Sequence, residues 1–205
     1  MIRAIIPIVF NDMPEIVPWL VVPIISAVSA FIVSRSLSER FKGDKTKTTI
    51  AFLLMTVIMS ILLTYFFGFT AIALKGMILS LIFMSASYQD IKTHECDDSI
   101  HPMILITGLI GLDCRDLTDM IISAAFVFLI MMLTLHITKS NIGGADIKFS
   151  VACAFVLGMR NGMLGLIIGL AVAVIINLIK LGKNKKEGFP MIPYLAAGFT
   201  VAYFF

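Results

Sequence analysis

Long apolar stretches constrain this chain more than any other feature of its sequence. A helix needs about 20 apolar residues, with a range of roughly 17–25, to cross the hydrocarbon core of a bilayer. Four stretches reach that length, namely Ile16–Val33, Thr48–Phe67, Thr70–Tyr88 and Met120–Ile137. Hydrophobic residues make up 59% of the chain and charged residues only 14%, whereas a soluble domain has roughly 45–50% and about 25%. The sequence therefore predicts a polytopic membrane protein.

Four further apolar segments are shorter or less uniform. Met163–Leu181 carries the polar Asn177, and the short ones are Ile100–Leu112, Ile147–Gly158 and Met191–Phe205. Short spans are tolerated inside a helix bundle, or where adjacent loops reach a water-filled cavity. We therefore expect an all-α fold, an integral membrane helix bundle of about eight transmembrane segments.

The basic residues indicate the orientation, because cytoplasmic loops carry an excess of Lys and Arg. When alternate loops are assigned to the cytoplasm, they hold most of the 16 basic residues, namely Arg35, Arg40, Lys42, Lys45, Lys47, Lys92, Lys139, Lys148, Lys180, Lys183, Lys185 and Lys186. The opposite side holds Arg3, Lys75, Arg115 and Arg160. This bias predicts a protein of the cytoplasmic membrane with both termini outside.

Several functional classes are excluded by charge and cysteine content. A formal net charge of +3, without a basic stripe, does not indicate nucleic-acid binding. Cys96, Cys114 and Cys153 form no CxxC pair and have no His at ligand spacing, so neither a zinc site nor a disulfide framework is expected. The N-terminal apolar run is broken by Pro7 and lacks a small-residue cleavage site, so we expect no cleavable signal peptide.

Two aspartates stand at helix boundaries on the predicted cytoplasmic face. Asp90 follows the third predicted span and Asp146 precedes the sixth, and an Ile-Lys pair follows each. Ionisable residues at membrane depth are costly and usually functional. Two facing carboxyl groups can share one proton, so that one activates water while the other protonates the substrate carbonyl. We predict Asp90 and Asp146 as an aspartyl-protease dyad that titrates as a unit.

Neighbouring residues suit this role. Gly143 and Gly144 permit a tight turn and the close approach of a second backbone. Asp146 would stand at or near the N-cap of the next helix, where the dipole favours its charged form. Lys92 and Lys148 can lay their stems along apolar surface and place their ammonium groups in the interface. Either aspartate alone would also fit an ordinary helix cap, and the two glycines an ordinary turn.

An acidic cluster follows the first aspartate. Glu95, Asp97 and Asp98, together with Asp90, form a negative patch that can attract a basic peptide segment. A solvated acidic loop explains the same residues equally well. His101 begins the short fourth segment without an identifiable partner. Gly165 and Gly169 have the spacing of a close helix contact.

Taken together, these residues resemble the prepilin peptidase family of membrane aspartyl proteases, including the archaeal preflagellin peptidases. The family's first motif, Asp-x-Arg/Lys-Ser/Thr followed by an acidic and polar run, corresponds to 90–98, with Cys96 where Ile is usual. Its Gly-x-Gly-Asp motif corresponds to 143–146, with Ala145 replacing the second glycine, although alanine disfavours positive φ. A Pro-x-x-Pro segment at 189–198 resembles the family's last-helix motif. The resemblance covers roughly residues 70–205.

The resemblance implies a membrane aspartic endopeptidase that cleaves short basic leaders from pilin, pseudopilin or archaellin precursors at the cytoplasmic face. It implies no metal and no organic cofactor. We expect one membrane-embedded domain over 1–205, with N-terminal spans in 1–69 and the catalytic core in 70–205. Large bacterial members carry a zinc-binding cytoplasmic domain after the first span and also N-methylate the product. Here that place holds only Ser34–Lys47, without cysteine, so no methyltransferase activity is expected.

Two other functions use the same residues. A small proton- or cation-coupled transporter also needs intramembrane carboxylates, but here both aspartates lie at one face rather than at the midplane. A presenilin-like intramembrane protease shares the Gly-x-Gly-Asp logic. That class predicts Tyr before the first aspartate and a Pro-Ala-Leu segment, whereas Gln89 precedes Asp90 and no Pro-Ala-Leu occurs.

Overall fold

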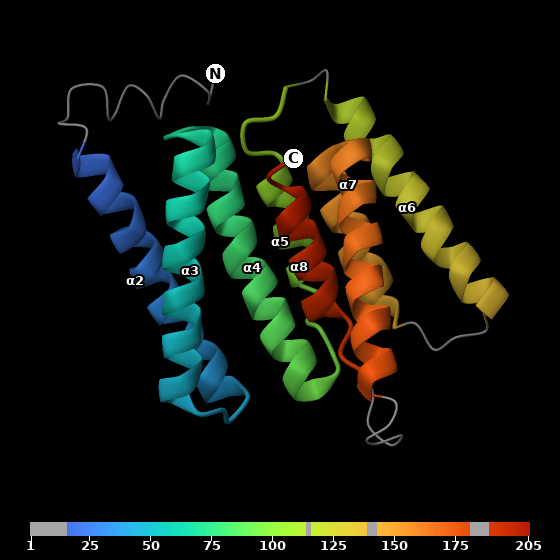
Figure 1. Ribbon diagram of the computed structural model, residues 1–205, viewed down its shortest axis with the longest axis horizontal. Helices are drawn as coiled ribbons and strands as arrows, with labels where there is room; N and C mark the ends of the chain where they lie inside the picture. The colour runs from blue at the N-terminus through green and yellow to red at the C-terminus, as the bar shows by residue number, and fades with distance from the viewer. Residues whose placement is uncertain (1–15, 114–115, 139–142, 181–188) are drawn as a thin grey trace. The chain divides into compact units, whose positions relative to one another are not determined.

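A computed structural model describes residues 16–113, 116–138, 143–180 and 189–205 (Figure 1). These residues form seven helices and no strand: α2 (Ile16–Arg40), α3 (Lys45–Phe67), α4 (Ala71–Thr93), α5 (Ile100–Gly108), α6 (Leu117–Thr138), α7 (Gly144–Lys180) and α8 (Ile192–Ala202). The predicted all-α fold is confirmed. The predictions that concern Arg3, Pro7, Cys114, Arg115, Lys139, Lys183, Lys185 and Lys186 fall outside the described residues.

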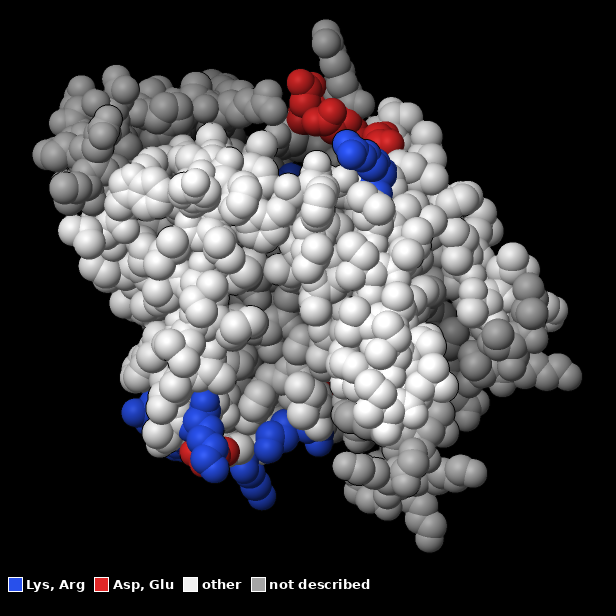
Figure 2. Space-filling model, viewed as in Figure 1, with Lys and Arg blue, Asp and Glu red and all other residues white. Residues whose placement is uncertain are grey.

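Five of these helices, α2, α3, α4, α6 and α7, are long and apolar enough to cross a membrane. Figure 2 shows charged side chains gathered at helix ends, with almost none across the middle of the visible face. The chain is therefore a multi-pass membrane protein. The number of spans, the cytoplasmic membrane and the positions of the termini stay predictions.

Helix boundaries differ from the apolar segments mainly where the helices end. α2 continues to Arg40 rather than Val33, and α4 continues to Thr93 rather than Tyr88. Hydropathy marks the apolar part of a helix, whereas polar residues can extend the same backbone hydrogen bonding beyond it. As a result, Asp90 lies in the last turn of α4 rather than after the helix.

α7 contains a reversal that joins the sixth and seventh predicted spans. The backbone at Gly158 is not helical, with φ 75° and ψ −179°, a conformation that glycine adopts without a steric penalty. The two halves of α7 therefore run in opposite directions, and its first and last turns lie at the same end of this helical hairpin (Figure 1). The amide of Met159 donates to the Asp119 carboxylate at 2.9 Å, which caps the second half of α7.

The chain divides into two compact units, Met1–Ser85 and Ala86–Phe205. The division at residues 69 and 70 expected from the sequence stays a prediction. The first unit contains α2, α3 and most of α4, with α2 packed against α3. Its buried hydroxyl groups mostly donate to carbonyl oxygens of their own helix, as Ser34, Ser38, Ser60 and Thr64 do. Such groups are satisfied locally and create no site.

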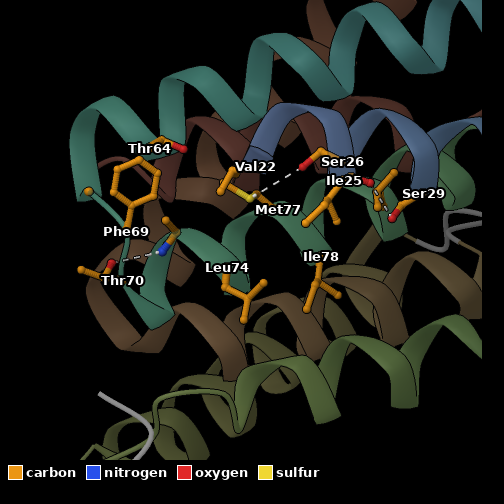
Figure 3. Close-up of a pocket in the computed structure, with 13 residues that line it drawn as sticks. Val22, Ile25, Ser26, Ser29, Thr64, Phe69, Thr70, Leu74, Met77 and Ile78 are labelled. Carbon is orange, nitrogen blue, oxygen red and sulfur yellow. Dashed lines mark hydrogen bonds between the residues drawn. The ribbon is translucent and has the colours of Figure 1, made fainter. Parts of the chain in front are cut away.

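A cavity of about 270 Å³ lies within the first unit, lined by thirteen residues of α2, α3, α4 and the α3–α4 link (Figure 3). Phe69, Leu74 and Ile78 are among its apolar lining, and Ser26 makes only a weak contact with the sulfur of Met77 at 3.9 Å. None of the thirteen side chains is ionisable. The cavity therefore offers no group for acid–base catalysis.

The second unit is built around α7, which packs against α5, α6 and α8. Phe149 and Phe199 are fully buried where α7 meets α8, with ring centroids 6.3 Å apart. A Cβ on Gly198 would collide with backbone atoms of Gly165 and Gly169. The sequence-based interpretation of Gly165 and Gly169 as a close helix contact is confirmed.

Candidate active site

Asp90 is buried at the end of α4, with only 6% of its surface exposed. One carboxylate oxygen accepts a hydrogen bond from the backbone amide of Ile192, the first residue of α8, at 2.9 Å. The amide of Met191 also interacts with this carboxylate. A buried carboxylate requires such donors, since an unpaired one carries a large desolvation penalty.

Asp146 is the third residue of α7 and so lies in its first turn, near the N-cap as predicted. Gly143 directly precedes the helix, and its carbonyl accepts the amide of Asp146 at 3.1 Å. The Asp146 carboxylate folds back to accept a hydrogen bond from the Gly143 amide, as the acidic residue of a capping box does. A Cβ on Gly143 would lie 3.0 Å from a carboxylate oxygen of Asp146. Gly143 therefore makes room for the second aspartate.

The other two residues of this turn, Gly144 and Ala145, are under weaker steric constraints than Gly143. A Cβ on Gly144 would meet nothing within 4 Å, so Gly144 borders open space. Ala145 lies within α7 and does not have a positive φ. Alanine adopts helical backbone freely, so the replacement of the family's second glycine fits this structure.

The structure brings the two aspartates into one electrostatic group. The charge of Asp90 acts on Asp146. Both also act on Cys96, since burial and the negative charges of Asp90, Asp97, Asp146 and Asp98 raise the pKa of its thiol to about 12. A buried carboxyl group and a partly buried one, placed this way, can share a proton. The arrangement can therefore act as an acid and a base at the same time.

The loop after α4 is tied back to the helix. The Gln89 side-chain oxygen accepts the amide of Asp97 at 3.1 Å, and Gln89 is buried. His94 turns the chain with a φ of 55°, in the left-handed region that non-glycine residues seldom adopt. These two features hold the acidic segment next to Asp90.

The predicted supporting residues have different positions. Lys148 and Asp98 form an ion pair at 2.8 Å, and the hydrogen bond and charge of Lys148 lower the pKa of Asp98. Asp98 therefore already has a cationic partner. Lys92 extends over the Tyr88 ring, 6.0 Å from its centroid, and Glu95 is exposed. Of these four supporting residues, Lys148 and Asp98 are the two that the structure joins in an ion pair.

His101 and Ile192 contribute contacts that the sequence did not reveal. The ring nitrogens of buried His101 lie 3.3 Å from the Asp98 carbonyl and 3.4 Å from the Ala145 carbonyl. His101 thus links the loop that follows α4 to the first turn of α7, which carries Asp146. One sequence signal pointed to the Ile192 contact. The last apolar segment has no Ser, Thr, Asp or Asn at its start, so the first amides of its helix need an acceptor from another part of the chain.

Within the described residues, no three His, Cys, Asp or Glu side chains are grouped so that they could hold a metal ion. The expectation that the reaction needs neither metal nor organic cofactor stays a prediction. Acid–base chemistry at two carboxyl groups uses side chains and water alone.

Comparison with known families agrees with the resemblance seen in the motifs. Residues 77–178 match the type IV leader peptidase family. The matched segment includes both aspartates and ends before α8. A search of curated proteins and a search of solved structures each found no match. Over residues 77–178, this multi-pass membrane protein therefore belongs to the type IV leader peptidase family.

Proposed function

We propose that this protein is a membrane aspartic endopeptidase that removes the short basic leader of type IV prepilin-like precursors. The substrates are pilin, pseudopilin or archaellin precursors, cleaved at the cytoplasmic membrane face. The observation that carries the proposal is the electrostatic grouping of Asp90 and Asp146, the aspartates of the two family motifs. The family match over residues 77–178 supports a peptidase of this class.

The reaction needs one ionised and one protonated carboxyl group. The ionised group takes a proton from water as the water oxygen attacks the scissile carbonyl carbon. The protonated group donates its proton to the carbonyl oxygen, which gives a neutral tetrahedral intermediate. Collapse of that intermediate breaks the C–N bond, and the proton taken from water passes to the leaving amine. At the same time one hydroxyl group of the intermediate returns its proton to the other aspartate, so both carboxyl groups regain their initial protonation states at the end of the turnover.

The acidic loop suits a basic leader. Glu95 is exposed and Asp97 lies beside Cys96, next to the two aspartates. Asp98 is paired with Lys148, so its charge is partly neutralised. Charge attraction by Glu95 and Asp97 would raise the local concentration of a cationic leader. Reversal of charge at Glu95 and Asp97 should raise KM and leave kcat unchanged, and an unchanged KM would exclude this role.

We also propose that the protein does not methylate its product. α2 ends at Arg40 and α3 begins at Lys45, so residues 41–44 alone connect them, and no cysteine lies there. Large family members place their zinc-binding domain at this position. Mass spectrometry of the new N-terminus should find an unmethylated amine. An N-methylated product formed by this protein alone would contradict the proposal.

A cleavage assay tests the peptidase directly. Membranes containing the protein are mixed with a panel of prepilin-like substrates, and cleavage is followed by gel shift. Wild type is compared with Asp90→Asn and Asp146→Asn at matched expression. Cleavage by wild type that both substitutions abolish would support the proposed dyad. Cleavage that survives either substitution would show that the catalytic pair is different.

A further inference from the structure

α8 begins fourteen residues beyond the end of the matched family segment at residue 178, yet its first amide contacts the first aspartate. We propose that the Ile192 amide is a positioning group for the candidate catalytic Asp90. This inference rests on the proposed peptidase function. It adds that this amide orients the Asp90 carboxylate and stabilises its charged form.

The start of α8 leaves one donor that must be satisfied from outside the helix. Tyr194 and Leu195 donate their amides to the Met191 carbonyl at 3.1 and 3.2 Å. Pro193 has no amide hydrogen. Met191, at the N-cap, makes no side-chain hydrogen bond to the helix. The Ile192 amide is therefore the remaining donor of this turn, and the Asp90 carboxylate accepts it at 2.9 Å.

α8 is fixed firmly enough to hold that amide in place. Ile192 and Leu195 are fully buried, and the Phe189 ring stacks on Tyr194 with centroids 5.1 Å apart. Phe199 packs on Phe149, one turn after Asp146 on α7. α8 thus contacts both elements of the dyad, Asp90 through an amide and the helix of Asp146 through packing.

The contact between the Ile192 amide and Asp90 also affects the charge of the carboxyl group. A backbone amide that donates to a carboxylate stabilises its ionised form. The other titratable groups that act on or near Asp90 are His94 and Cys96 in the loop after α4, and Asp146 on α7. Among the described residues, the α8 amides are the backbone donors to Asp90. These amides stabilise the ionised form of Asp90, as the Gly143 amide does for Asp146.

An amide-to-ester exchange isolates the contact. Replacement of Ile192 by its α-hydroxy acid analogue, introduced by nonsense suppression, removes the N–H and keeps the side chain. The matched control is the same exchange at Leu195, whose amide donates to Met191 and not to Asp90. Asp90→Asn and wild type are measured beside them. The readouts are kcat, KM and the pH dependence of kcat/KM for a cleaved prepilin-like substrate.

We expect the ester at position 192 to lower kcat roughly 10- to 100-fold with little change in KM, since hydrogen bonds to charged groups contribute strongly. The acid limb of the pH profile should move to higher pH, because the carboxylate has lost a donor that favours its charge. The ester at position 195 should leave both unchanged. Equal kcat and equal pH profiles for the two esters, beside an inactive Asp90→Asn, would overturn the positioning role alone. Undiminished cleavage by Asp90→Asn would overturn the proposed function and this inference with it.

Discussion

Two aspartates of the second unit each accept a hydrogen bond from a backbone amide where a helical segment begins. Asp90 accepts the first amide of α8, and Asp119 accepts the Met159 amide where α7 reverses, each at 2.9 Å. Asp119 is exposed, whereas Asp90 is buried and acts on a second carboxyl group, Asp146. The shared contact is a helix cap in both cases. Burial and the neighbouring carboxyl group distinguish the candidate catalytic aspartate from a structural one.

The largest expected difference between the two aspartates is in catalysis. Asp90→Asn should reduce kcat by about 10³-fold or more, because it removes acid–base chemistry. Asp119→Asn should leave kcat within about twofold, since Asp119 contacts α7 at the reversal, at the other end of its first half from Asp146. Cleavage assays at matched expression measure both. A similar loss in the two variants would remove the distinction.

The turn before Asp146 offers a matched pair of glycines. Gly143→Ala should lower kcat about tenfold or more, because its Cβ would lie 3.0 Å from the Asp146 carboxylate and displace it. Gly144→Ala should stay close to wild type, since nothing lies within 4 Å of the added methyl group. Equal activity of the two variants would mean that the position of Asp146 does not limit the reaction.

Substitution of the exposed helix-capping Asp119 should mainly lower the stability of the protein. Asp119→Ala removes the acceptor of the Met159 amide and should lower the free energy of unfolding by about 1 kcal/mol, as the loss of a helix cap typically does. Thermal unfolding in detergent measures this change as a lower Tm. Thr118→Ala, at an exposed neighbouring position, serves as the control. A Tm equal to that of the control would show that the cap at the reversal is not needed.

The smallest expected effect concerns Cys96. Burial and four nearby carboxylates raise the pKa of its thiol to about 12, so alkylation at pH 8 should be slow because only the thiolate reacts. Asp97→Asn removes one negative charge, which lowers the thiol pKa and increases the thiolate fraction at fixed pH. We expect alkylation to become a few-fold faster, with Cys114 and Cys153 replaced by Ser. Asp119→Asn in the same background should not change the rate.

Much of the fold follows from local sequence properties. The eight apolar segments correspond to α2–α8 once α7 is divided at Gly158, because apolar run length is a property of consecutive residues. The two aspartate motifs were also readable, since family motifs are local patterns. Helix ends were less accurate, as α4 shows, because hydropathy does not register a polar last turn.

The sequence by itself determined a multi-pass helical membrane protein, its leader-peptidase motifs and the two candidate aspartates. Only the tertiary structure decided which groups those aspartates contact. Ile192 lies 102 residues from Asp90, Lys148 lies 50 from Asp98, and His101 lies 44 from Ala145. No local pattern encodes these pairs, because each forms only when packing brings a donor of one helix or loop to an acceptor of another. The physical reason is that hydrophobicity adds up along the chain, whereas a hydrogen bond depends on where two distant groups meet.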